Sequence, residues 1–197
     1  MTIETLAEPK ADLRKKALAR RRALEPSDRE AFSARLADEG AKLARRLGSR
    51  VVSAFHPIGD EPDTLGLLRE LAERGLVTAL PVTGSRRQPL RFRAWRPGEP
   101  TIAGPLRILE PPPSAREVEP DLLFVPLAAF DRRGHRIGYG AGHYDRTLRR
   151  LRAAGPIRAV GVAYSVCEIA AAPNEAHDEP LDFILTEREW IAARSPC

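Results

Sequence analysis

The chain is organised around one stretch, Phe130-Asp-Arg-Arg-Gly-His-Arg-Ile-Gly-Tyr-Gly-Ala-Gly-His-Tyr-Asp145. The apolar run Leu122–Pro126 precedes it and is typical of a buried strand. Residues 147–151 follow it and predict a helix that carries two leucines on one face. Further strands and helices alternate on both sides of this unit. The alternation predicts an α/β fold with a largely parallel central sheet.

The loop in this stretch combines glycines with arginines. Glycines let backbone N–H groups turn toward an anion, and arginines donate paired hydrogen bonds to phosphate oxygens. A helix N-terminus directly downstream favours the same ligand. The pattern is neither a Walker loop nor a dinucleotide fingerprint, because Gly138, Gly140 and Gly142 are spaced by two and no Gly-Lys-Ser/Thr follows. A plain glycine-rich turn is the alternative. Asp145 favours phosphate binding with Mg²⁺, since a carboxylate beside a polyanion needs a cation.

Composition predicts one globular domain over residues 1–197. The chain has 43% hydrophobic residues and a net charge of +5, which favours anionic partners. Its two cysteines, Cys167 and Cys197, form neither a disulfide framework nor a metal pair, so we expect a reducing cytoplasmic location. Residues 1–9 lack an apolar signal segment, and no apolar run is long enough to span a bilayer. We expect no membrane partner, and nothing demands more than a monomer.

Apolar spacing and turn residues set the remaining elements. Ser27 and Glu30 are three residues apart and predict a capping box, Gly48 predicts a helix end, and Asp63 predicts a helix cap. Residues 111–120 predict a proline-rich connector. Helices are expected over residues 10–24, 26–47, 64–74 and 165–172, with a short helix and tail over 186–197; strands are expected over residues 51–55, 76–81, 90–95 and 158–164.

Four further groups of residues are candidates for ligand contacts, and three of them allow more than one interpretation. Lys10 and Arg14 share one helix face, which predicts either a solvated basic surface or a phosphate contact. Arginines around Trp95 fit either a solvated strand or a single-stranded nucleic-acid surface. The tip after residue 55, rich in glycine and proline, is a usual place for ligand contacts. The cluster at 177–182 fits either a metal site or solvated loop acids, and its members are His177, Asp178, Glu179 and Asp182.

The segment Arg136-Ile-Gly-Tyr-Gly-Ala-Gly-His-Tyr-Asp145, preceded by Phe130-Asp131, resembles the signature of 5-formyltetrahydrofolate cyclo-ligases, also called methenyltetrahydrofolate synthetases. The resemblance extends over residues 10–186. It implies a three-layer fold akin to those of sugar-phosphate isomerases and CoA-transferases. Tyr139 and Ala141 stand where several relatives carry Arg and Lys, and His143 replaces the usual aromatic residue.

The resemblance also implies an activity and its site. The reaction would be the ATP-dependent cyclisation of 5-formyltetrahydrofolate to 5,10-methenyltetrahydrofolate, with Mg²⁺ as cofactor. Arg136, Asp145 and Glu61 would be catalytic, and Mg²⁺ would lie between Asp145 and Asp182. The folate would contact His56, Glu61, Tyr139, Gly140, Ala141, Gly142 and His143. ATP would contact Lys10, Arg14, Arg136, Ile137, Gly138, Tyr139, Gly140, Ala141, Gly142, His143 and Tyr144.

Three other functions remain open at this point. The same nucleotide loop fits an ATP-dependent kinase or ligase that acts on another small metabolite. The basic first helix and the arginines at 91–96 fit a nucleic-acid-binding module, although we expect no nucleic-acid partner. Tyr139 and Ala141 leave room for a form that binds folate without catalysis, because they reduce the number of cations around a triphosphate.

Overall fold

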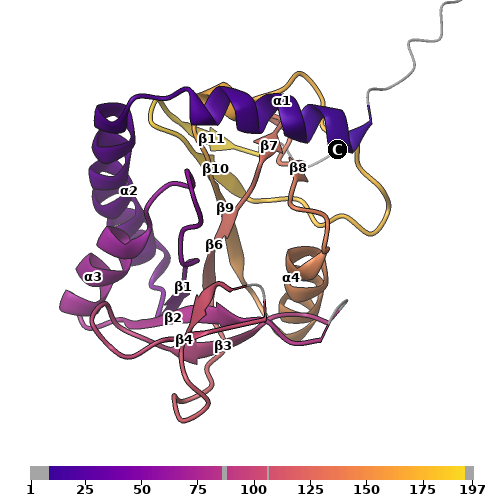
Figure 1. Ribbon diagram of the computed structural model, residues 1–197. Helices are drawn as coiled ribbons and strands as arrows, with labels where there is room; N and C mark the ends of the chain where they lie inside the picture. The colour runs from indigo at the N-terminus through magenta and orange to yellow at the C-terminus, as the bar shows by residue number, and fades with distance from the viewer. Residues whose placement is uncertain (1–8, 86–87, 106, 194–197) are drawn as a thin grey trace, which may run out of the picture.

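The computed structural model describes residues 9–85, 88–105 and 107–193. These residues fold around a seven-stranded sheet in the order β11-β10-β9-β6-β1-β2-β3 (Figure 1). The five inner strands are parallel, and the two edge strands run antiparallel to their neighbours. The largely parallel sheet is therefore confirmed. The strands are β1 (Val51–Ser53), β2 (Val77–Val82), β3 (Arg91–Ala94), β6 (Leu122–Pro126), β9 (Arg158–Val162), β10 (Phe183–Leu185) and β11 (Trp190–Ala192).

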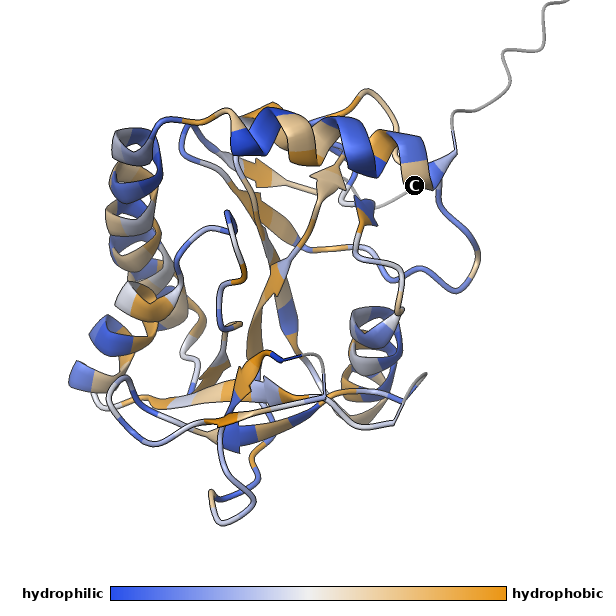
Figure 2. Cartoon of the chain, in the orientation of Figure 1, coloured by the Kyte–Doolittle hydropathy of each residue, from blue (hydrophilic) through white to orange (hydrophobic). Residues whose placement is uncertain are grey.

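Helices cover both faces of the sheet, which gives three layers (Figure 1). On one face lie α2 (Pro26–Leu47) and α3 (Leu65–Glu73), and on the other lies α4 (His143–Ala154). Alternate residues of β6 enter the two cores: Phe124 packs with the first pair of helices, and Leu123 packs with α4. A parallel strand covered on both faces reads as a continuous apolar run, which explains the sequence of β6. Figure 2 shows apolar residues along these strands.

The first helix, α1 (Lys10–Arg22), lies across the top of the molecule in Figure 1. It contacts β7 (Ala129–Phe130) and the single turn η1 (Ser165–Cys167). Strand β7 forms a hairpin with β8 (Arg136–Ile137), and a second hairpin joins β4 (Ile102–Ala103) to β5 (Leu109–Glu110). The glycine-rich loop after β8 leads directly into α4.

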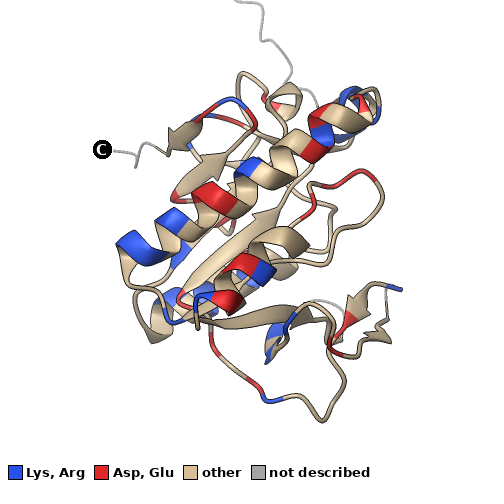
Figure 3. Ribbon diagram, turned by 90° about the vertical axis from the view of Figure 1, so that its left-hand side faces the viewer, with Lys and Arg blue, Asp and Glu red and all other residues tan. Residues whose placement is uncertain are grey.

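The long helix α2 has the predicted bounds, and Gly48 ends it in the left-handed conformation with φ +64°. The predicted capping box is wrong. The N-cap residue is Glu25, no side chain caps this end, and Pro26 begins the helix. Figure 3 shows that the outer face of α2 carries both charges, among them the ion pair of Lys42 with Asp38 at 2.6 Å.

The two helices predicted near the C-terminus are wrong. Residues 165–172 contain only the turn η1, because Ile169 donates a backbone hydrogen bond to Phe130 at 2.9 Å and the chain runs beside β7. Between residues 186 and 193 the chain forms strand β11, which pairs with the edge of β10 through Trp190 and Leu185. Residues 194–197, with Cys197, lie outside the described residues.

Candidate active site

A cavity of about 780 Å³ opens beyond the carboxyl ends of β1, β2 and β6. This is the edge of a parallel sheet where ligands usually bind. Four segments far apart in the sequence line the cavity: α1, residues 55–61, residues 136–145 and residues 175–178. One half of its lining is apolar, and the other half is charged.

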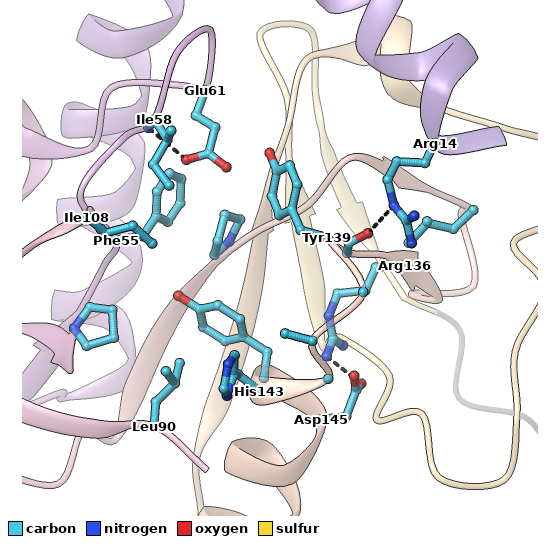
Figure 4. Close-up of a pocket in the computed structure, with 18 of the residues that line it drawn as sticks. Arg14, Phe55, Ile58, Glu61, Leu90, Ile108, Arg136, Tyr139, His143 and Asp145 are labelled. Carbon is cyan, nitrogen blue, oxygen red and sulfur yellow. Dashed lines mark hydrogen bonds and ion pairs between the residues drawn. The ribbon is translucent and has the colours of Figure 1, made fainter. Parts of the chain in front are cut away.

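The apolar half is built from side chains of several strands and loops (Figure 4). The buried ring of Phe55 follows β1, Leu90 precedes β3, and Ile108 reaches the cavity from the β4–β5 hairpin. Tyr144, in the first turn of α4, adds an aromatic ring, and burial raises the pKa of its hydroxyl, which stays protonated. His56 lines the same region, with its Nδ1 3.3 Å from the carbonyl oxygen of Pro57. A flat, largely apolar ligand fits this lining.

One carboxylate, that of Glu61, lies buried at the wall of the apolar half, and its residue is 7% exposed. The backbone N–H of Ile58 donates to its Oε2 at 3.0 Å. Burial raises the pKa of Glu61, and hydrogen bonds from the Tyr139 hydroxyl and from Ile58 oppose that shift. Figure 4 shows the Tyr139 hydroxyl pointing toward this carboxylate. Glu61 is thus a positioned acceptor with few competing waters.

Tyr139 joins the glycine loop to α1. Its hydroxyl accepts a hydrogen bond from Arg21 at 2.9 Å, and Arg21 also contacts Asp60 at 3.4 Å. The guanidinium of Arg21 is buried, so these two oxygens are its partners inside the site. Sequence reasoning did not include Arg21, although its spacing of seven from Arg14 places both on one face of α1.

The charged half contains the cations predicted from the sequence. Arg14 donates from Nε to the carbonyl oxygen of Gly138 at 2.7 Å, so it lies directly against the glycine loop (Figure 4). Lys10 pairs with Asp178 at 2.8 Å and with Glu175 at 3.2 Å. Burial lowers the pKa of Lys10, but these hydrogen bonds outweigh burial and raise it overall. The amine is therefore charged.

Arg136 and Asp145 form a close pair, with 2.6 Å between guanidinium and carboxylate (Figure 4). The Arg136 side chain is only 5% exposed. Burial lowers the pKa of Arg136, and the charge of Asp145 opposes that effect. Asp145 stands in the first turn of α4, where the helix dipole also favours a negative group.

The glycine loop passes through two left-handed residues, Gly140 with φ +97° and Gly142 with φ +64°. Gly142 is the N-cap of α4, which begins at His143 and so four residues before the helix predicted from the sequence. Arg146 donates to the carbonyl oxygens of Ala141 and Gly142, both at 2.9 Å. In a trans peptide the N–H points away from the C=O, so the amides of Gly142 and His143 face away from Arg146. The glycine loop therefore ends at a helix N-terminus, a place where proteins often bind anions.

The expected pairing of Asp145 with Asp182 is corrected by the structure. Asp182 lies at the amino end of β10, where it pairs with Arg152 and Arg158, both at 3.1 Å. It also accepts a hydrogen bond from the backbone of Ala159 at 2.9 Å. Asp145 lines the cavity, whereas Asp182 is not among the described residues that line it, and the Asp182 carboxylate is occupied by these partners.

Asp178, four residues before Asp182, faces the cavity instead. The backbone N–H of the next residue, Glu179, donates to Asp145 at 3.2 Å, and the charges of Asp145 and Asp178 both act to raise the pKa of Arg136. Burial raises the pKa of Asp178, but hydrogen bonds from Lys10 and from the Glu175 amide lower it overall, so the carboxylate stays ionised. From the residues alone, the cluster at 177–182 fitted either solvated acids or a metal site, and the family resemblance selected Asp182 rather than Asp178.

The arginines at 91–96 do not form one exposed surface. Arg93 is buried and donates to the carbonyl oxygen of Pro111 at 2.9 Å. Arg91 pairs with Glu117 at 3.0 Å. A nucleic-acid interface needs cations free to meet phosphates, so the structure gives this alternative little support.

Comparison with known protein families gives one decisive match. A model described as the 5-formyltetrahydrofolate cyclo-ligase family matches residues 7–187. The chain belongs to this family.

Curated relatives with the same description span nearly the whole chain. The 5-formyltetrahydrofolate cyclo-ligase of Mycolicibacterium smegmatis is 34% identical over 192 residues, which cover 93% of this chain and 96% of the relative. That of Escherichia coli K12 is 31% identical over 183 residues, which cover 87% of this chain and 98% of the relative.

Solved structures agree with the family assignment. The NMR structure of Aquifex aeolicus 5,10-methenyltetrahydrofolate synthetase has a TM-score of 0.79 and 29% identity, and covers 95% of this chain and 94% of that chain. The Mycoplasma pneumoniae 5,10-methenyltetrahydrofolate synthetase supports the fold, with a TM-score of 0.72 at 20% identity over 95% of this chain and 100% of that chain.

Two positions that depart from the cyclo-ligase signature have local partners. Tyr139 contacts Arg21 and Glu61, as described above. His143 places its Nδ1 2.9 Å from the carbonyl oxygen of Gln88, and so connects the start of α4 to the segment before β3. Ala141 has no side-chain group to offer a phosphate.

No helix in the described parts of the chain combines the length and apolar character needed to cross a membrane.

Proposed function

We propose that the protein catalyses the ATP- and Mg²⁺-dependent cyclisation of 5-formyltetrahydrofolate to 5,10-methenyltetrahydrofolate, with release of ADP and phosphate. One observation carries the proposal: a single cavity joins an apolar half with the buried Glu61 to a charged half built on the glycine loop. Membership of the cyclo-ligase family and the names of its relatives support the same reaction. One chain supplies all these residues, so we propose that a monomer is active.

The reaction has to convert a formyl oxygen into a leaving group. The formyl oxygen attacks the γ-phosphorus of ATP, and the bond from that phosphorus to the bridging oxygen of ADP breaks. The N10 amine then attacks the activated formyl carbon and loses a proton. Release of inorganic phosphate, which carries away the former formyl oxygen, completes the ring. Phosphoryl transfer of this kind depends mainly on positioning and on charge stabilisation.

The apolar half would hold the folate. Phe55 and Tyr144 offer faces for the pterin ring, and Glu61 offers a buried acceptor for its N–H groups. Because Glu61 is fixed by Ile58 and Tyr139, it orients the ring at low cost in side-chain entropy. The formyl group would then lie toward the glycine loop, whose residues 139–143 line the boundary between the two halves.

The charged half would hold the triphosphate. Arg136 is buried and charged beside Asp145, so it meets a phosphate oxygen in a site of low dielectric. From α1, Arg14 contacts the glycine loop and Lys10 contacts Asp178 at the same cavity. Amides of the glycine loop and the N-terminus of α4 add neutral donors for oxygens that become more negative as the phosphoryl group moves.

Mg²⁺ fits this half through Asp145 and Asp178. Both carboxylates face the cavity, and Mg²⁺ in phosphate sites typically takes one or two carboxylates together with phosphate oxygens. When bound, the ion screens the β and γ oxygens of ATP. Asp178 thus replaces the aspartate at 182 in the proposed metal site.

The direct test is the rise in methenyl absorbance when the protein is mixed with 5-formyltetrahydrofolate, ATP and Mg²⁺. We expect the rise to need all three additions, and Asp145→Asn to abolish it. ADP formation without methenyl product would indicate a different acceptor. Folate binding without ADP formation would indicate a non-catalytic form, and either result would overturn the proposal.

A further inference from the structure

The segment of residues 175–182 lies along α4, and Glu179 uses both its side chain and its main chain to hold the segment there. Its carboxylate pairs with Arg149 at 3.3 Å and with Arg152 at 2.9 Å. Its backbone N–H donates to Asp145 at 3.2 Å, and its carbonyl oxygen accepts a hydrogen bond from Arg136. Glu179 therefore contacts both members of the Arg136–Asp145 pair through its main chain and α4 through its side chain.

The two arginines are placed for this contact by the helix period. Asp145, Arg149 and Arg152 are spaced by four and three, which puts them on one face of α4. Arg149 also donates to the carbonyl oxygen of His177 at 2.6 Å, and Arg152 to that of Pro180 at 2.8 Å. The same helix face thus holds the segment on both sides of Glu179.

The charges of Arg149 and Arg152 explain why the Glu179 side chain is needed to hold the segment on α4. Arg149 and Arg152 place two positive charges beside one stretch of backbone, and the Glu179 carboxylate, 19% exposed, lies between them. A carboxylate satisfies both guanidinium groups at once, whereas an amide offers one acceptor and one donor. Without the carboxylate, the donor of an amide would face a cation, and the segment would be held to α4 by the carbonyl oxygens of His177 and Pro180, by Asp182 and by the Glu179 backbone amide.

We propose that Glu179 is a positioning residue for the magnesium–triphosphate half of the cavity. This inference rests on the metal site proposed above. Its carboxylate fixes residues 177–180 to α4. The fixed backbone then orients Asp145 and Arg136 and presents Asp178 to the same space. Partners of this kind behind metal ligands typically change metal affinity by about 10- to 100-fold when removed.

The first test uses the protein without ligands and so does not depend on the proposed function. In Glu179→Gln, hydrogen exchange of the amides of residues 178 and 179 should be faster by about tenfold or more, since both donate bonds within this arrangement. The matched control is Glu119→Gln, which removes the partner of Arg150 on another face of the same helix, at 2.9 Å. Unchanged exchange at 178 and 179 in Glu179→Gln would overturn the proposal.

The second test measures binding rather than turnover. By calorimetry, the Kd for Mg²⁺-ADP should rise about tenfold in Glu179→Gln and stay unchanged in Glu119→Gln. The Kd for 5-formyltetrahydrofolate should be unchanged in both, because the segment does not line the apolar half. Equal loss of nucleotide and folate affinity would indicate a merely structural role. If Glu179→Gln does not fold, Arg149→Gln removes one of the two cations and should shift exchange and nucleotide affinity in the same direction.

Discussion

The aspartates at 178 and 182 belong to one loop and yet have different partners. Asp178 faces the cavity beside Lys10, and Asp182 holds two arginines and the start of β9. A carboxylate already paired with two cations is poorly available to a third. The local charge around each residue therefore decides its role.

Asp178→Asn should raise the Mg²⁺ concentration for half-maximal activity by about tenfold, because one of two proposed carboxylate ligands is lost. Asp182→Asn should leave that concentration unchanged and lower the free energy of unfolding by about 1 kcal/mol, because it weakens bonds to Arg152 and Arg158. Magnesium titrations of the initial rate and thermal unfolding of both variants check this. A larger magnesium effect in the 182 variant would restore the original assignment.

At Glu61 we expect the requirements of fold stability and of folate binding to conflict. Burial raises its pKa above the ordinary 4.5, so the folded state binds the proton more tightly than the unfolded state. This contribution to stability is present below pH 4.5 and is lost as the pH rises through the folded-state pKa. Glu61→Gln should therefore melt above the wild type at pH 7, with the difference shrinking as the pH falls to 4.5.

The same variant should bind 5-formyltetrahydrofolate at least tenfold more weakly, since a charged acceptor becomes neutral. Thermal unfolding across this pH range and a folate titration check both parts. A Glu61→Gln protein that is less stable at pH 7, with intact folate affinity, would show that the carboxylate serves packing alone.

At the level of elements, helices and strands with a strong apolar pattern of their own were predicted correctly. Elements that form only because a neighbouring element is present were not. Helix α2 carries its own apolar stripe and stop signal, so residues 26–47 were predicted with the correct bounds. Strand β11 has little pattern of its own, and it exists because β10 offers an edge. The start of α4 was missed because its first turn reads as part of a glycine-rich loop.

The turn into α4 can be tested through its N-cap. Gly142→Ala should lower the free energy of unfolding by about 1–2 kcal/mol, because alanine is strained at φ +64°. It should also raise the KM for ATP, since the loop must shift. Gly138→Ala is the matched control: an added Cβ there meets nothing within 4 Å, so the melting temperature should not change. Equal stability of both variants would show that the left-handed turn is not required.

At the level of the whole molecule, the site unites distant segments. The sequence predicted the cavity-lining residues of the signature and of the basic helix, because these are local patterns, but it left out apolar ones such as Phe55, Leu90 and Ile108. It did not predict that Asp178 rather than Asp182 lines the cavity with Asp145, or that Arg21 reaches Tyr139, because these positions depend on how α1 and residues 175–182 pack around the sheet.

Ligands should therefore stabilise the whole fold. Mg²⁺-ADP at about 100 times its Kd should add about 2.7 kcal/mol to the free energy of unfolding, and 5-formyltetrahydrofolate should add its own increment. In Asp178→Asn at the same concentrations, the Mg²⁺-ADP increment should fall and the folate increment should remain. Calorimetric melting with each ligand checks this. Loss of both increments would mean that the two halves of the cavity do not bind separately.

The contact between Lys10 and Asp178 spans 168 positions of the chain. During translation Lys10 emerges from the ribosome early, whereas Asp178 emerges near the end. The proposed nucleotide site is therefore complete only after the last segment emerges, and until then the growing polypeptide has to rely on its own sheet and helices.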